Sequence, residues 1–289
     1  MSVILSEAKN LAGSSDSLPQ SEKLPRGQIL RRYAPQDDRL GWAGIPFVVG
    51  FLLIGLTIAG CSSSLPAANN QLLVFTKTEG FRHGSIEDGV AALRQLGETH
   101  GFTIEHTEDA SSFTPDALAT VDAVVFLNTT GDVLDDAQQT ALRDYIHGGG
   151  GFVGVHSAAD TEYDWPWYGV LVGAYFESHP AIQEATITVT DNDHPATRSL
   201  PSLWVRTDEW YNYRTPALPT ARVLLHLDAS SYEGSTMGDD HPIAWTQDLR
   251  DGRSFYTGLG HTSESYAEPL FLAHLTGGIC WAARLACER

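Results

Sequence analysis

Cysteine is scarce in this chain of 289 residues, which contains only three, at positions 61, 280 and 287. The last two lie seven residues apart on an apolar pattern that predicts a helix from Tyr266 to Ala286. Two helical turns would separate their Cα atoms by about 10 Å, beyond the reach of a disulfide unless the helix frays. We therefore interpret Cys280 and Cys287 as packing residues. Because Cys61 precedes the predicted globular part, no thiol remains there for nucleophilic catalysis.

Basic residues are also few, with 18 Lys and Arg against 36 Asp and Glu. Six of the basic and five of the acidic residues lie in residues 1–60, which leaves 12 against 31 and a net charge of −19 for the rest of the chain. A body this acidic does not attract nucleic acid or anionic lipid through its general field. A neutral substrate such as a sugar, or a bound cation, fits it better.

Signatures of nucleotide binding and of serine hydrolases are missing. The glycine run at 148–151 has neither the GxGxxG nor the Walker spacing, and a strand rather than a helix follows it. We interpret this run as a helix stop and a tight turn. His156 and Ser157 stand at a strand end, as the residues of a nucleophile elbow do, but the surrounding residues are not GxSxG.

One apolar run near the N-terminus, residues 45–60, is sixteen residues long, which is short for a membrane span. It ends in small residues directly before Cys61, and Ile58-Ala59-Gly60-Cys61 resembles the lipobox of a bacterial lipoprotein signal. The resemblance implies cleavage before Cys61 and attachment of lipid to its sulfur and its new amino group. An uncleaved anchor helix or a chance apolar stretch is the alternative.

These features predict three segments. Residues 1–60 form an N-terminal extension with a signal peptide, residues 61–70 a flexible tether, and residues 71–289 one globular domain long enough to bury a substantial core. The protein is then expected to be exported and anchored by lipid to the bacterial cell envelope, on its periplasmic or outer face.

Strand and helix patterns alternate in the first half of the globular part. Apolar runs predict strands at 71–76, 102–106, 123–127 and 152–155. Helical patterns lie between them at 85–99, 115–119 and 135–147. Strand, helix, strand in this order implies parallel pairing and a doubly wound, mostly parallel α/β sheet. Further strands follow in the C-terminal half, at 185–190, 203–206, 223–227, 243–246 and 254–256. Some of them are expected to extend the sheet, and others to form antiparallel additions beside the site.

Six histidines fall where an apparent strand gives way to a loop or where a loop begins: His83, His156, His179, His194, His241 and His261. Ligands of an open α/β sheet bind just beyond the carboxyl ends of its strands, so imidazoles collecting there predict a polar small-molecule site. His156 and His261, followed by His83, are the leading candidates for acid/base catalysis or metal binding. We interpret His194 and His241, which precede prolines, as residues that shape turns.

Two neighbouring carboxylates, Asp208 and Glu209, are candidates for proton transfer beside those histidines. The aromatic residues that follow them offer ring faces that stack on the apolar faces of pyranose rings. The substrate-binding candidates are Arg82, Ser157, Trp210 and Tyr211. A purely structural role, such as a solvated turn, is the alternative for this group.

Several ordered motifs together resemble the ThuA-like (trehalose utilisation) family. They are TKTEGFRH at 76–83, GGGFVGVHSA at 149–158, DHP at 193–195, DE at 208–209, HPIAW at 241–245 and GRSFYTGLGH at 252–261. The resemblance spans nearly all of residues 71–285 and implies a class I glutamine amidotransferase-like fold, which is a flavodoxin-like α/β sandwich. It also implies that His156 stands near the position of the amidotransferase nucleophile, so glutaminase activity is not expected.

The same resemblance implies a role in the use of trehalose or related disaccharides, in part through 3-keto derivatives. A 3-keto sugar carries an acidified proton next to its carbonyl, so histidine and carboxylate could drive hydrolysis, elimination or isomerisation without an organic cofactor. A divalent metal is a further candidate, with ligands among His83, His156, His179 and His261. The competing hypothesis is a non-catalytic module that binds carbohydrate and presents it to partner enzymes at the membrane. The sequence does not fix the oligomeric state.

Overall fold

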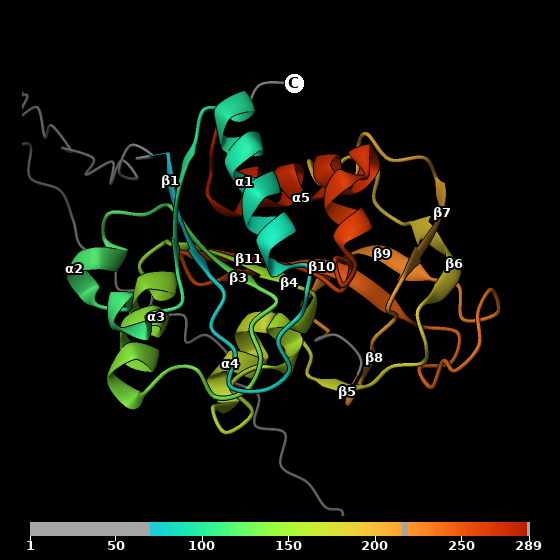
Figure 1. Ribbon diagram of the computed structural model, residues 1–289, viewed down its shortest axis with the longest axis horizontal. Helices are drawn as coiled ribbons and strands as arrows, with labels where there is room; N and C mark the ends of the chain where they lie inside the picture. Colours follow the sequence, from blue (N-terminus) through green and yellow to red (C-terminus); the bar gives the residue numbers. More distant parts are fainter. Residues whose placement is uncertain (1–69, 216–218, 288–289) are drawn as a thin grey trace, which may run out of the picture. The chain divides into compact units, whose positions relative to one another are not determined.

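The computed structural model describes residues 70–215 and 219–287 (Figure 1). Residues 1–69, which contain the predicted signal peptide, Cys61 and most of the predicted tether, lie outside the described residues. Within the described ranges no helix is both long enough and apolar enough to cross a bilayer.

Five parallel strands form one half of a nine-stranded sheet, whose order is β2-β1-β3-β4-β11-β10-β9-β6-β7. These five are β1 (Gln71–Phe75), β2 (Thr103–Thr107), β3 (Ala123–Leu127), β4 (Gly151–Val155) and β11 (Gly252–Thr257). Every residue of β3 and β4 is buried, as expected for strands that helices cover on both faces. The predicted doubly wound α/β fold is confirmed.

Helices cover both faces of the parallel half. They are α1 (Ile86–His100), α2 (Pro115–Leu118), α3 (Asp136–His147), α4 (Pro166–Val172) and α5 (Pro269–Ala282). Figure 1 shows α1 and α5 on one face of the sheet and α2, α3 and α4 on the other. Local chemistry sets their ends: Asp135 forms a capping box with Gln138 at the start of α3, and Gly101 closes α1 in the left-handed conformation.

Antiparallel strands extend the sheet on its other side, as the sequence predicts. They are β10 (Pro242–Leu249), β9 (Arg222–Leu227), β6 (Gln183–Val189) and β7 (Leu203–Asp208). A separate two-stranded pair joins β5 (Phe176–Ser178) to β8 (Asn212–Tyr213). Single turns of 3₁₀-helix occur at Ala110–Ser112 (η1), His156–Asp160 (η2) and Ser263–Ala267 (η3). β11 pairs in parallel with β4 and antiparallel with β10, so it joins the two halves.

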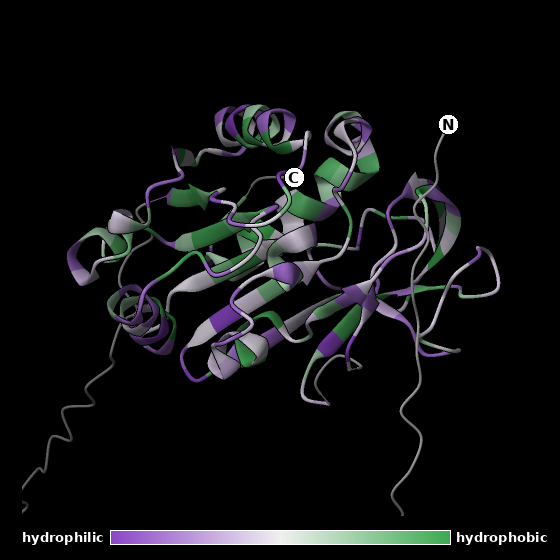
Figure 2. Cartoon of the chain, turned by 60° about the horizontal axis from the view of Figure 1, so that its bottom comes forward, coloured by the Kyte–Doolittle hydropathy of each residue, from purple (hydrophilic) through white to green (hydrophobic). Residues whose placement is uncertain are grey.

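Buried aromatic rings line up across the parallel strands. The ring centroids of Phe75 and Phe126 are 5.3 Å apart, and those of Phe126 and Phe152 are also 5.3 Å apart. Each fully buried phenylalanine stabilises the fold by about 2–3 kcal/mol relative to an exposed one. Figure 2 shows the hydrophobic residues concentrated along the central strands. The core therefore lies between the helices and the parallel half of the sheet.

The interpretation of Cys280 and Cys287 as packing residues was wrong, because they form a disulfide with a Cα–Cα separation of 5.9 Å. Helix α5 ends at Ala282, four residues before the predicted end. Arg284 then adopts a left-handed conformation with φ of +56°, and the chain turns back. Two helical turns therefore do not separate the two cysteines, and the assumption behind the distance argument fails.

Candidate functional site

Three loops that follow parallel strands meet at the carboxyl edge of the sheet. His83 lies in the loop after β1, His156 directly follows β4, and His261 lies in the loop after β11. Glu209 reaches the same place from the end of the antiparallel strand β7. One ligand atom from each of these four residues lies within 4.8 Å of all the others. We call these four residues the His/Glu cluster; it could hold a metal ion.

The backbone turns sharply at His156, as the sequence predicts. Its φ is +50°, in the left-handed region that non-glycine residues seldom occupy. Such conformations persist where the surrounding structure enforces them, and they are concentrated at functional sites. Here the turn carries the imidazole from the end of a buried strand into the His/Glu cluster.

Two nitrogen atoms and one oxygen atom of the cluster lie within 3.4 Å of one another. His156 Nε2 is 3.0 Å from His261 Nδ1 and 3.4 Å from Glu209 Oε2, and His261 Nδ1 is 3.1 Å from Glu209 Oε2. Adjacent ligands of a tetrahedral zinc ion with bonds of about 2.0–2.1 Å lie about 3.3–3.4 Å apart. The donor set and its spacing therefore fit a divalent metal.

Hydrogen bonds outside the cluster orient its imidazoles. His156 Nδ1 lies 3.0 Å from the carbonyl oxygen of Gly258, so it donates a proton there and leaves the Nε2 lone pair facing the cluster. His83 Nδ1 lies 3.3 Å from Ser157 Oγ. The predicted candidate Ser157 is thus placed to orient His83.

Burial and charge set the protonation of the cluster. Burial, with the neighbouring His156 and His261, lowers the pKa of His83 to about 3, so this imidazole is neutral at pH 7. Burial alone would raise the pKa of Glu209, but the adjacent imidazoles of His156 and His261 lower it well below its usual range. The cluster therefore combines a neutral imidazole, that of His83, with an ionised carboxylate, that of Glu209.

His179 lies at the mouth of the site and outside the four-residue cluster. Its Nδ1 is 3.0 Å from Glu209 Oε1 and 2.9 Å from the carbonyl oxygen of Pro180. Its side chain is 43% exposed, whereas that of Glu209 is 8% exposed. Of the four histidines predicted as metal ligands, His83, His156 and His261 lie in the cluster, and Glu209 is its fourth member. His179 contacts the other oxygen of the Glu209 carboxylate, Oε1.

Asp208 is fully buried behind the site. Its carboxylate accepts hydrogen bonds from the backbone N–H groups of Gly260, at 2.9 Å, and His261, at 3.1 Å, and it pairs with Arg206 at 3.2 Å. Of the two carboxylates that the sequence singles out, Glu209 thus enters the cluster. Asp208 holds the loop that presents His261.

Arg82 and Trp210, both predicted to bind substrate, lie outside the cluster. Arg82 forms ion pairs of 2.7 Å with Glu87 and with Glu108. Trp210 is fully buried, and its indole N–H donates to the carbonyl oxygen of Gln183 at 2.9 Å. The structure therefore leaves no face of the Trp210 ring open for a sugar to stack on.

Tyr211, the other predicted aromatic contact, is 2% exposed and packs its ring 4.2 Å from that of His156. His241, which is also buried, lies 2.8 Å from the carbonyl oxygen of Tyr211 and 3.0 Å from the hydroxyl of Tyr232. In His194, Nδ1 accepts a hydrogen bond from the backbone N–H of Ala196 at 3.1 Å. Neither His241 nor His194 belongs to the cluster.

Two residues near the cluster were missed in the sequence. Phe81 is 66% exposed, and its ring centroid is 5.0 Å from that of His83 in an edge-to-face contact. Asp160 ends the 3₁₀ segment that begins at His156. Burial raises its pKa although a hydrogen bond from Tyr163, the charge of Arg214 and the nearby His156 and His179 act in the opposite direction. Their positions in the loops after β1 and β4 are the signal that could have identified them.

Comparisons with known proteins find similarity over most of the globular part. Residues 71–282 match the family model described as ThuA, trehalose utilisation. The crystal structure of a ThuA-like protein from Bacteroides uniformis ATCC 8492 aligns with a TM-score of 0.63 at 24% identity, and the alignment covers 77% of this chain and 94% of that one. A ThuA-like protein from Parabacteroides merdae ATCC 43184 aligns with a TM-score of 0.63 at 21% identity, covering 76% and 92%.

A more distant likeness, with a TM-score of 0.51 at 14% identity, is to a β-galactosidase from Bacillus circulans sp. alkalophilus; it covers 75% of this chain and 32% of that enzyme. A comparison with curated proteins gave no match. At these identities the structural likenesses show the fold alone. They confirm the flavodoxin-like α/β architecture.

Proposed function

The chain belongs to the ThuA (trehalose utilisation) family, and from this membership and the His/Glu cluster we propose that it acts on trehalose, a related disaccharide or a 3-keto derivative of one. The observation that carries the proposal is the convergence of His83, His156, His261 and Glu209 within 4.8 Å. They meet at the sheet edge where α/β proteins of this type bind their ligands.

We assign proton transfer to His179, with Glu209 as the residue that positions it. His179 Nδ1 faces both a carboxylate and a backbone carbonyl oxygen, so this nitrogen carries the proton and Nε2 is left as the base. A base oriented by a carboxylate is a recurring arrangement in enzymes. The half-exposed ring can take a proton from the carbon next to a sugar carbonyl and return it to another atom.

The cluster itself is proposed to bind a divalent metal through His83, His156, His261 and Glu209. Such an ion supplies Lewis-acid polarisation of a sugar oxygen. Within the cluster, the orienting bonds to Gly258 and Ser157 keep the ring nitrogens of His156 and His83 in place.

Phe81 is the residue that we propose for stacking against the sugar. It lies beside His83, and Thr130 Oγ1 donates to its carbonyl oxygen at 2.9 Å, which holds the loop. An exposed aromatic ring next to a polar site suits the apolar face of a pyranose. Asp160, near the same opening, can accept sugar hydroxyl groups.

The test uses the purified full-length protein, first stripped of metal with a chelator. It is incubated with 3-keto-trehalose in the presence of Zn²⁺, Mn²⁺ or neither, and products are followed by NMR. We expect turnover that needs metal, and a loss of about a hundredfold or more in His179→Ala with metal content retained. His226→Ala, on a surface histidine that pairs with Asp240, is the matched control and should keep full turnover. Unchanged substrate in every condition would contradict the enzymatic proposal.

The competing function, a non-catalytic sugar-binding module, is favoured by one observation, the exposed Phe81 ring beside the site. It predicts that calorimetric binding of a disaccharide survives His156→Ala with at most a modest loss. The enzymatic proposal predicts that this substitution abolishes turnover while the protein remains folded.

We further propose that the protein is a lipoprotein attached to the cell envelope through Cys61. Support comes from the Ile58-Ala59-Gly60-Cys61 motif after an apolar run. The first strand begins at Gln71, and ten residues of extended chain reach about 35 Å at most. A sugar-processing domain on so short a tether works close to the membrane surface.

A further inference from the structure

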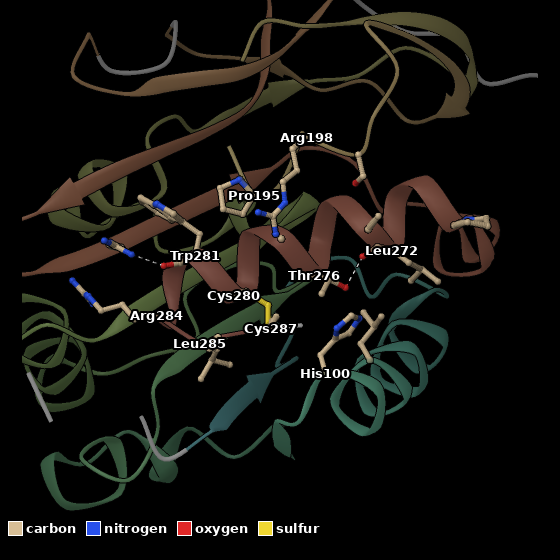
Figure 3. A pocket seen from close by; sticks show the side chains of 17 residues that line it. His100, Pro195, Arg198, Leu272, Thr276, Cys280, Trp281, Arg284, Leu285 and Cys287 are labelled. Atoms are coloured by element: carbon tan, nitrogen blue, oxygen red, sulfur yellow. Dashed lines mark hydrogen bonds between the residues drawn. A yellow bond between two sulfur atoms is a disulfide. The ribbon is translucent and has the colours of Figure 1, made fainter. Parts of the chain in front are cut away.

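A hollow of about 1170 Å³ runs along the outer side of α5 and the C-terminal loop (Figure 3). Its walls are mainly apolar and include Leu96 of α1, Leu272 and Trp281 of α5, and Leu285 of the loop. No residue of the His/Glu cluster lines it. Mostly apolar hollows of several hundred Å³ are the usual form of small-molecule sites.

Three arginines, Arg198, Arg253 and Arg284, also line this hollow. Among the residues that the structure describes, neither Arg198 nor Arg284 forms an ion pair with a carboxylate, and Arg253 has only Asp248 at 3.8 Å. Arg284 instead donates to the carbonyl oxygens of Gly149 and Asp251. Arg198 therefore lines the hollow without a carboxylate partner, and in a body with an excess of acidic residues it offers a local contact for an anion.

The backbone around Arg284 is held firmly although its conformation favours glycine. Arg284 has φ of +56°, and the following N–H, of Leu285, donates to the carbonyl oxygen of Cys280 at 2.9 Å. The disulfide between Cys280 and Cys287 closes the same turn. The loop that carries Arg284 beside the hollow is therefore fixed in place.

We propose that this hollow binds a long-chain fatty acid. The acyl chain lies along the apolar wall, and the carboxylate pairs with Arg198. Helix α5 has 14 residues and is about 21 Å long, comparable to an extended palmitoyl chain. Guanidinium groups are suited to a carboxylate because they offer paired donors in one plane. A sugar is excluded by the predominance of apolar wall.

The test titrates the full-length protein with a brominated long-chain fatty acid and follows tryptophan fluorescence. Bromine quenches a tryptophan only on near contact, so quenching reports on Trp281, and Trp281→Phe should remove most of it. Arg198→Gln should weaken binding about tenfold, because a charge-assisted hydrogen bond is lost. Arg94→Gln, on an exposed arginine of α1 that does not line the hollow, is the matched control and should leave the affinity unchanged.

Two further ligands, a fatty alcohol and anionic vesicles, distinguish fatty-acid binding from other uses of the hollow. A fatty alcohol of the same chain length should bind at least tenfold more weakly than the acid; equal binding would overturn the role of Arg198. Absence of quenching would overturn the proposal. Binding to anionic vesicles that Arg198→Gln abolishes, without quenching by the monomeric acid, would assign the hollow to a membrane surface and would also overturn it.

Discussion

His156 combines a chemical role with an unusual backbone conformation, and the two can be separated by substitution. At φ of +50°, asparagine is tolerated much better than alanine, whose Cβ crowds the following carbonyl group. We expect both His156→Asn and His156→Ala to lose metal and turnover. In urea titrations, however, the asparagine variant should be more stable by about 1 kcal/mol. Equal free energies of unfolding would show that the conformation does not strain the native chain.

Two buried histidines outside the cluster make stability depend on pH. Burial lowers the pKa of His194 and of His274 to about 4, against 6.5 for an exposed imidazole. The unfolded chain then binds more protons between pH 6.5 and pH 4, so the free energy of unfolding falls as the pH is lowered through that window. Each histidine contributes up to about 3 kcal/mol to this loss.

The measurement for these two histidines is urea unfolding at a series of pH values. His274→Gln should make the free energy of unfolding depend less on pH between pH 6.5 and pH 4. This holds even if the substitution also changes the stability at neutral pH. His226→Gln, on a partly exposed histidine that pairs with Asp240, is the control. An unchanged slope in His274→Gln would contradict the assignment.

For single residues, the sequence predicted that histidines and carboxylates come together at the site. It did not predict which of two neighbouring carboxylates enters the His/Glu cluster. His83, His156 and His261 could be predicted because each follows a strand whose carboxyl end borders the site. Asp208 and Glu209 could not be told apart, since the choice depends on how β7 ends and on the position of Arg206, which pairs with Asp208. Trp210 could not be excluded either, because its burial depends on packing from distant parts of the chain.

Helix α5 depends on two consecutive glycines for its close approach to the sheet and to the loop at Pro195. A Cβ atom at Gly278 would lie 2.1 Å from the ring of Phe255, and one at Gly277 would lie 2.1 Å from the carbonyl oxygen of Pro195. Alanine favours helix by about 1 kcal/mol over glycine, yet Gly278→Ala should destabilise the protein by about 1–3 kcal/mol because the ring must move.

Thermal unfolding measures the effect of Gly278→Ala. Gly84→Ala is the matched control, because a Cβ atom there meets nothing within 4 Å. The control should be neutral or slightly stabilising. A gain in melting temperature for Gly278→Ala would show that the helix and sheet are not packed as described.

Most elements could be predicted, and the misses share a cause. Most strands of the parallel half are continuous apolar runs, and helices α1 and α3 have a clear apolar face, so both kinds stand out in the sequence. Helix α4 has seven residues, and β5 and β8 have three and two, which is too short for a period to emerge. The end of α5 was misplaced because Arg284 occupies a position where the sequence signal would be glycine.

The His/Glu cluster draws on both halves of the molecule, since His83, His156 and His261 follow parallel strands and Glu209 follows an antiparallel one. A metal that binds this cluster can bind only the folded chain. Zinc at a hundred times its dissociation constant should therefore raise the free energy of unfolding by about 2.7 kcal/mol. Calorimetry before and after chelation measures it, with Glu209→Gln expected to abolish the shift. A chelator without effect on the melting temperature of the zinc-loaded protein would count against metal binding.

The proposed lipid anchor makes a prediction for the whole molecule. Cys61→Ser removes the thiol that receives the lipid, so the variant should lose incorporation of labelled fatty acid and should shift in molecular mass. Cys287→Ser, which leaves Cys61 in place, is the control and should still be labelled. Labelling that persists in Cys61→Ser would exclude lipidation at this residue.

The position of β11 also has a consequence for how the chain folds. β4 pairs with a strand about a hundred residues later, as the register of Gly151 with Arg253 shows. Until that strand arrives, the parallel half has an unpaired edge of apolar sequence along β4, which is prone to pair with other chains. Folding is therefore expected to be slow and to finish late, after nearly the whole domain has been synthesised. A chain with this order of assembly is expected to aggregate more readily when β11 is deleted or delayed than when an edge strand such as β7 is.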